Sequence, residues 1–288
     1  MEKAIFGPGG NEENFSLSYK SSVDAPEYLK NMGLDAYEYQ CGRGINITEE
    51  KAFELGCKAK EFGIALSLHS PYFINLSSVD EDRVQKNIKY ITDSCRITKI
   101  MGGNRVVVHC GGLSGKTREE AFANTIVNIR QALNEMDLLG LSDICLCIET
   151  MGKINVLGDL DEVIDICRSF DCILPCIDFG HLNSRTQGGI DDPQAFDNVL
   201  VKLINGLGYE RASKMHVHFS RIEYSSGGEV RHTTFDNEQF GPSPELIGLM
   251  VKHKLYPTVI CESAGTQARD ALALKQIYIN AGGCHELY

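Results

Sequence analysis

The chain has 288 residues, of which 43% are apolar and 23% charged, and this composition excludes disordered and fibrous proteins. Acidic residues outnumber basic ones by 39 to 28, so the net charge of −11 argues against a broad basic surface for sequence-independent nucleic-acid binding. The 11 cysteines are scattered without a CxxC pair, which is typical of a reduced protein rather than a disulfide scaffold.

The N-terminal segment MEKAIFGPGG has no signal-peptide pattern, and no apolar run reaches membrane-spanning length. We therefore expect a cytoplasmic protein without a membrane partner. No linker or low-complexity tract divides the sequence, which predicts one domain over residues 1–288, expected as a monomer.

Short strand-like runs alternate with longer amphipathic stretches along the chain. Strands are predicted near residues 4–6, 36–39, 64–69, 105–109, 144–149, 173–178, 215–219 and 258–262. Helices between them include 48–62, 80–101, 117–139 and 266–281, with the N-cap residues Thr48, Asp80, Thr117 and Thr266. Eight β/α alternations in a chain of this length predict one closed (β/α)8 barrel, a TIM barrel, rather than an open doubly wound sheet.

Side-chain size alternates along these strands. In residues 64–69 the large aliphatic residues occupy one alternating set, while small residues and His69 occupy the other. Because successive side chains point to opposite faces of a strand, the large set is expected to face the helices. Residues 144–149 repeat the pattern, with two cysteines as small filler below Glu149.

Six predicted strands end in a residue that is able to bind a metal ion. These residues are His69, His109, Glu149, Asp178, His216 and Glu262. The C-terminal strand ends of a TIM barrel meet at one mouth, where its catalytic residues lie. So many buried ionisable groups require a cation, and imidazole with carboxylate suits Zn²⁺, Mn²⁺ or Fe²⁺. Glu149, on a central strand, is the candidate bridge between two ions.

Other candidate ligands lie close to these strands. His181 is in the loop after the sixth strand. His216 and His218 are two residues apart and must share one face of their strand. Past that strand, Glu229 and His232 lie on a glycine-flanked loop that is long enough to fold over the mouth.

The ordered motifs resemble those of the endonuclease IV family, which are metal-dependent barrel enzymes that incise DNA at abasic sites. The strongest stretch is HSPYFINLSS at residues 69–78, and VVVHCGG, CIET, CIDFGH, MHVHFS, VRH and ICES follow in the family's order. The resemblance implies that a zinc-activated hydroxide hydrolyses double-stranded DNA 5′ to an abasic site.

The resemblance also implies a trinuclear zinc site. The first ion would be held by His69, His109 and Glu149. Glu149 would bridge to a second ion, held by Asp178, His216 and Glu262. His181 and His232 would hold the third ion. Glu149 and Glu262 are the candidate catalytic carboxylates.

Three residues are candidates for contact with the substrate. Tyr72 and Phe73 match positions where the family places side chains that enter the DNA at the lesion, and such side chains can fill the space that a flipped nucleotide leaves. Arg43 lies in the loop QCGRGINIT after the second strand, which is short and poor in basic residues for a loop that grips DNA.

The third metal site departs from the family's pattern. The family has an aspartate two residues before the last histidine, where this chain has Val230, and the nearest carboxylate is Glu229. Three alternatives are open: Glu229 replaces the aspartate, His218 supplies the missing ligand, or the site holds only two ions. We therefore expect two to three zinc ions.

A sugar isomerase or epimerase of the xylose isomerase-like superfamily is the competing interpretation. Its members share a set of four ligands that binds one metal ion, represented here by Glu149, Asp178, His216 and Glu262. Two glutamates shuttle protons beside the sugar carbonyl in such enzymes. Phosphodiester cleavage benefits from further metal ions, so the additional histidines favour the phosphodiesterase.

Overall fold

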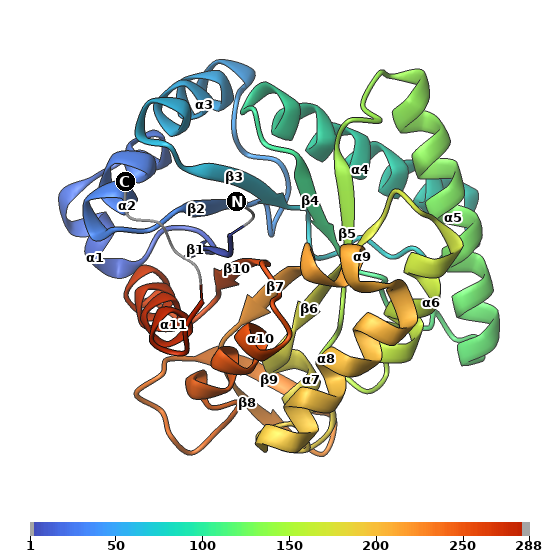
Figure 1. Cartoon of the computed structure of the whole chain (residues 1–288). Helices are drawn as coiled ribbons and strands as arrows, with labels where there is room; N and C mark the ends of the chain where they lie inside the picture. Colours follow the sequence, from blue (N-terminus) through green and yellow to red (C-terminus); the bar gives the residue numbers. More distant parts are fainter. Residues whose placement is uncertain (1–2, 284–288) are drawn as a thin grey trace.

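The structure is a computed structural model that describes residues 3–283, in which the eight expected strands form one sheet (Figure 1). The strands are β1 (Ile5–Pro8), β2 (Ala36–Gln40), β3 (Ala65–His69), β4 (Arg105–Val108), β5 (Cys145–Glu149), β6 (Leu174–Asp178), β7 (His216–Phe219) and β10 (Thr258–Cys261). They pair in parallel in the order β1-β10-β7-β6-β5-β4-β3-β2. A parallel bridge between Gly9 and Glu38 joins the two outer strands, so the sheet is a nearly closed barrel. The predicted TIM barrel is confirmed.

Helices cover the outside of the barrel (Figure 1). They are α1 (Glu13–Ser18), α2 (Ala25–Met32), α3 (Glu49–Phe62), α4 (Glu81–Ile100), α5 (Arg118–Leu138), α6 (Leu160–Ser169), α7 (Phe179–Arg185), α8 (Pro193–Leu207), α9 (Tyr209–Ser213), α10 (Leu249–Lys252) and α11 (Gln267–Asn280). The helices α3, α4 and α5 begin as predicted, because Thr48, Asp80 and Thr117 each accept a hydrogen bond from a backbone N–H of the first turn. Within residues 3–283, no helix combines the length and apolar character that a membrane span requires.

The N-terminus of α11 differs from the prediction. Thr266 precedes this helix, but its hydroxyl donates to Asp270 (2.7 Å) and its side chain accepts no capping hydrogen bond. Glu12 performs this role, because its carboxylate accepts from the backbone N–H groups of Ala268 and Arg269 at 3.2 and 3.1 Å. Since Glu12 follows β1, the first and last β/α units of the barrel are held together by this contact.

Two apolar layers separate as the alternating side-chain size predicts. The main core lies between strands and helices and contains Leu66 and Leu68. Val107, Cys147 and Cys176 form a separate small cluster, which lies inside the barrel. The small residues thus face inward, and every cysteine of residues 3–283 is free.

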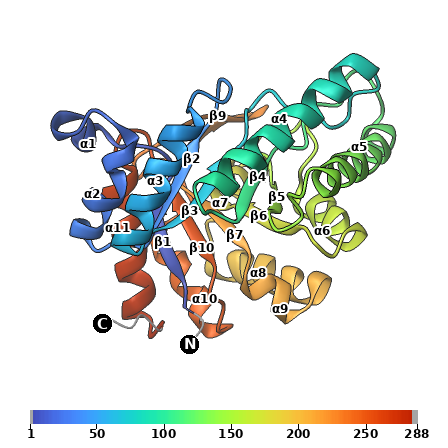
Figure 2. The same cartoon turned by 90° about the horizontal axis from the view of Figure 1, so that it is seen from above.

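The segment after β7 is a β-hairpin, whereas the sequence predicts a loop. Its antiparallel strands are β8 (Arg221–Ser225) and β9 (Gly228–Thr233). Ser226 and Gly227 form the turn between them, and β9 begins at Gly228, whose φ of 93° favours glycine. In Figure 2, β9 lies at the end of the barrel opposite to the chain termini, which places it at the mouth.

Candidate active site

A cavity of about 870 Å³ opens at the C-terminal ends of the strands. Most of the predicted site residues line it, namely His69, Tyr72, Phe73, His109, Glu149, His181, Glu229, His232 and Glu262. Asp178, His216 and His218 are fully buried and do not contribute to this lining. Arg43 lies in an exposed turn after β2 and is not part of the lining. The barrel therefore brings together the predicted histidines and carboxylates, and leaves Arg43 apart.

Glu149, the last residue of β5, lies at the centre of the cluster. Its Oε2 is 2.8 Å from His109 Nε2 and 3.2 Å from His69 Nε2. Its Oε1 is 2.9 Å from His218 Nδ1 and 3.5 Å from His181 Nδ1. Burial alone would raise the pKa of Glu149, but His218 and His109 hold it well below its ordinary value. One ionised carboxylate therefore faces four imidazoles that come from four different segments.

His218 reaches the mouth, and His216 does not. The prediction that His216 ends its strand is wrong, because His216 is the first residue of β7. It pairs with Cys176 of β6, whereas His218 pairs with Asp178, one layer closer to the mouth. The two histidines do share a face, as their spacing predicts, but a period of two does not decide which one lies at the rim. Ligand atoms of four residues lie within 4.8 Å of one another here: Glu149, Asp178, His218 and Glu262.

Glu38, in the middle of β2, is a site residue that the sequence analysis missed. It is fully buried, and its Oε1 and Oε2 lie 3.0 Å from His218 Nε2 and His216 Nε2, respectively. Ser67 donates to Oε2 (2.8 Å) and Gln40 to Oε1 (3.3 Å). Burial alone would raise the pKa of Glu38, but the two histidines hold it well below its ordinary value. The available signal was a lone carboxylate within the otherwise uncharged strand AYEYQ.

Burial shifts the pKa values of His216 and Glu262 in opposite directions. Burial lowers the pKa of His216 to about 4 and raises that of Glu262 to about 7. Glu262 follows β10, and its Oε1 accepts from Gln40 Nε2 (3.3 Å). Glu149 and Glu262 therefore share one site with pKa values that are shifted in opposite directions, which suits one for constant charge and the other for proton exchange.

A β-bulge brings Glu229 and His232 to the same side of β9. Glu223 pairs with Arg231 and Tyr224 pairs with Glu229, so that Val230 is an extra, unpaired residue. Glu229 lies three residues before His232, one more than the aspartate of the family. The unpaired Val230 compensates for this extra residue. Glu229 Oε2 lies 3.4 Å from His181 Nε2, and one ligand atom from each of His181, Glu229 and His232 lies within 4.8 Å of the others. Of the three alternatives for this site, the structure therefore favours the one in which Glu229 replaces the aspartate.

Tyr72 and Phe73 follow β3 at the rim and are half exposed. The ring of Tyr72 stacks on that of His109, with centroids 5.4 Å apart, and its hydroxyl donates to Gln40 (2.8 Å). Phe73 packs edge-on against Tyr90 of α4. Tyr72 thus covers the histidines, while Phe73 lies at the outer wall of the cavity.

The donor set fits divalent metal ions. It consists of imidazole and carboxylate, and the residues that line the cavity, all within the described range, include no cysteine. Asp178 Oδ2 is buried and accepts no hydrogen bond, although His181 Nδ1 lies 3.1 Å away. A buried carboxylate oxygen without a hydrogen bond, directed into a cluster of imidazoles, is what a bound cation would complete.

Comparison with known proteins decides the family. Residues 26–277 match the model of the xylose isomerase-like TIM barrel family. The chain belongs to this family. An uncharacterized protein of Methanocaldococcus jannaschii is 33% identical over 276 residues, which are 95% of this chain and 96% of that protein. A probable endonuclease 4 of Acholeplasma laidlawii is 29% identical over 252 residues, 82% of this chain and 80% of that protein.

Solved structures with this fold include an endonuclease and an epimerase-like protein. Endonuclease IV of Thermus thermophilus has a TM-score of 0.70 at 15% identity, with 96% of this chain and 98% of that chain covered. A D-tagatose 3-epimerase-like protein has the same TM-score at 20% identity, with 96% of each chain covered. The family match, together with the endonuclease 4 relatives at low sequence identity, places the chain among the enzymes of the xylose isomerase-like superfamily.

Proposed function

We propose that this member of the xylose isomerase-like family is a metal-dependent phosphodiesterase that hydrolyses double-stranded DNA 5′ to abasic sites. The observation that carries the proposal is the set of contacts of Glu149 with four imidazoles. A single ion cannot use all of these ligands together with the carboxylates around them, whereas cleavage of a phosphodiester benefits from two or three. Endonuclease 4 relatives over most of the chain support the same activity.

The residues fall into three groups of candidate ligands. In this proposal His69, His109 and Glu149 hold one ion, Glu149, Asp178, His218 and Glu262 hold a second, and His181, Glu229 and His232 hold a third. Zn²⁺ is the proposed metal, with Mn²⁺ or Fe²⁺ as alternatives for the same donors. Ions bound there supply Lewis acidity and lower the pKa of a coordinated water molecule.

The remaining residues would hold the substrate and exclude water. Tyr72 covers His109, so a DNA backbone that approaches this histidine must displace the ring or slide beneath it. The displaced ring is half exposed already and is able to pack against bases beside the lesion. Gln40, which bonds to both Tyr72 and Glu262, couples the position of the ring to the catalytic carboxylate.

A ketose epimerase is the second candidate, and one observation favours it. Glu149 and Glu262 are two members of a four-ligand group, and the pKa of Glu262, raised to about 7, suits a proton shuttle at a sugar carbon. However, this reaction leaves His69, His109 and the group of His232 without a role. Phosphodiester hydrolysis uses all of them.

The two functions are separated by one assay. We expect purified protein to nick a labelled duplex that carries a single tetrahydrofuran abasic analogue, on the 5′ side of the lesion, and to leave the undamaged duplex intact. Chelation should abolish the cleavage, and Zn²⁺ or Mn²⁺ should restore it. Turnover of a ketose panel, followed by chromatography of the epimers, without nicking of the abasic duplex would contradict the proposal.

The bulge in β9 gives a prediction for the third ion. Glu229→Gln should lower the metal content by about one equivalent and slow cleavage, because an amide oxygen is a weaker ligand than a carboxylate. Adding Val230→Asp, which places a carboxylate at the family's usual spacing, should not restore the lost equivalent, because Val230 is 52% exposed and unpaired. Val230→Asp alone is the matched control and should keep the wild-type metal content. Restored binding in the double variant would show that the bulge does not decide the ligand.

A further inference from the structure

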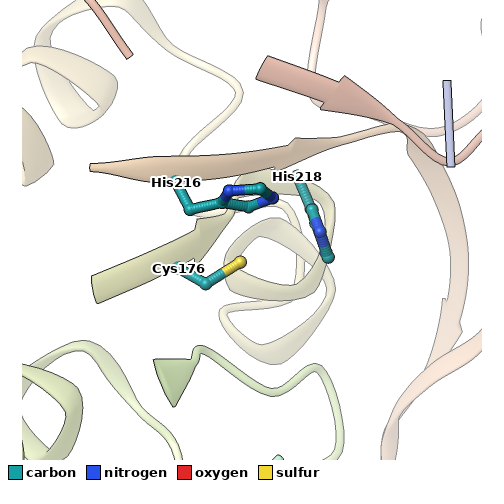
Figure 3. Close-up of side chains that lie close together, drawn as sticks. All are labelled: Cys176, His216 and His218. Atoms are coloured by element: carbon teal, nitrogen blue, oxygen red, sulfur yellow. The ribbon is translucent and has the colours of Figure 1, made fainter. Parts of the chain in front are cut away.

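Three metal-competent side chains meet inside the barrel, one layer below the mouth. Cys176 of β6 and His216 of β7 are cross-strand neighbours in the register of the sheet. His218 lies two residues further along β7, on the same face. Figure 3 shows the sulfur of Cys176 pointing towards the two rings, and one ligand atom from each residue lies within 4.8 Å of the others. All three side chains are fully buried.

The ring of His216 makes no hydrogen bond of normal geometry. Both of its nitrogens are buried, and neither makes a hydrogen bond. Nε2 lies 3.0 Å from Glu38 Oε2, but the carboxylate is not in line with the N–H or lone-pair direction that a hydrogen bond needs. A buried imidazole whose nitrogens make no aligned hydrogen bond is unfavourable, and a metal ion that accepts a lone pair of the ring removes the penalty.

We propose that Cys176, His216 and His218 bind a divalent ion of the zinc type in a closed site beneath the mouth. Thiolate with imidazole is the donor set that proteins use for tetrahedral Zn²⁺, and it differs from the carboxylate-rich set above it. Because the three residues are fully buried, no position is open for a substrate. The site is therefore structural in kind.

Glu38 completes the charge balance of this site. Its two carboxylate oxygens lie 3.0 Å from His216 Nε2 and from His218 Nε2. One thiolate and one carboxylate carry together the charge that neutralises a divalent cation, and a neutral cluster is far less costly to bury than a single charge. Ser67, which donates to Glu38 at 2.8 Å, fixes the carboxylate in this position.

The buried ion would also fix the ligand set of the mouth. His218 turns Nδ1 towards Glu149 (2.9 Å) and Nε2 towards Glu38 (3.0 Å), so with one ion at the mouth and one below it the ring would bind both as an imidazolate that has lost its N–H proton. A group that holds Nε2 in place also sets the direction in which Nδ1 points. The inference does not depend on the proposed DNA substrate, since it concerns only the contents of the barrel interior.

Cobalt substitution tests the site directly. Protein produced in Co²⁺-supplemented medium and kept reduced should show the near-ultraviolet charge-transfer band of a cobalt–thiolate bond. The donors of the mouth include no sulfur, so ions there do not produce this band. We expect Cys176→Ser to lose the band together with about one equivalent of metal. Cys167→Ser is the matched control, because Cys167 is equally buried but lies on α6 outside the barrel, and it should retain both.

Either of two results would overturn the site: wild-type cobalt protein without the band, or Cys176→Ser protein that keeps it. If Cys176→Ser does not fold, zinc-edge X-ray absorption of the wild-type protein replaces it, where a sulfur neighbour supports the site and its absence refutes it. The outcome is independent of the cleavage assay. If the protein shows the band but does not cut DNA, the buried site is supported and the proposed function is contradicted.

Discussion

Glu149→Gln protein is expected to lose cleavage of abasic duplex by on the order of a thousandfold or more in kcat, because several kcal/mol of metal-assisted stabilisation depend on one carboxylate. The substitution keeps the size of the side chain and removes the charge that four imidazoles face. Metal content should fall in the same variant. Steady-state kinetics and elemental analysis measure the two effects.

The matched control for Glu149 is Glu119→Gln, which removes a carboxylate that is exposed on α5 and should leave both quantities unchanged. Circular dichroism would show that each variant is folded. Glu149→Gln protein with wild-type metal content would remove the ground for the metal centre, whatever its activity. Normal metal content in the control and loss in the variant would assign the effect to the mouth.

Glu38→Gln protein is expected to bind the metal ions of the mouth about 10- to 100-fold more weakly, which is the usual cost of removing a carboxylate that orients a ligating histidine. Glu38 is a positioning residue, since its contact with the mouth runs through His218. Weaker metal binding should lower the cleavage activity of this variant, and the activity should return when the metal concentration is raised. Titration of metal-depleted protein with Zn²⁺ against a competing chelator measures the affinity.

Ser67→Ala provides the graded comparison for Glu38. It removes one hydrogen bond to the carboxylate and keeps the charge, so its effect on metal affinity should be smaller than that of Glu38→Gln. An unchanged affinity in Glu38→Gln protein, or lost activity that excess metal does not restore, would contradict the positioning role.

The barrel itself was predictable from local pattern. Strands such as β3 and β5 alternate large and small residues with a period of two, and this alternation is a property of neighbouring residues in the chain. Caps such as Thr117 act within four residues. The cap of α11 was not predictable in this way, because its acceptor Glu12 lies more than 250 residues away and only barrel closure brings the two together.

The sequence predicted which kinds of residue meet at the candidate site, but not which individual residue takes each position. That His69, His109, Glu149 and Glu262 meet at one mouth follows from their positions at or just after strand ends, because parallel strands end at the same side of a barrel. The choice between His216 and His218 depends on where β7 starts relative to β6, which is a property of sheet register. The fit of Glu229 depends on a bulge that spacing alone does not reveal.

The sequence by itself determined which chemistry is available to this protein: imidazoles and carboxylates at strand ends, with small residues beneath them. Only the tertiary structure decided which of these groups face one another. Glu38 shows the reason most clearly, since it lies 180 residues from His218 in the chain and 3.0 Å from it in space. Local periodicity carries no information about such a pair. Strand register and barrel closure bring it together, and both are decided by packing over the whole chain.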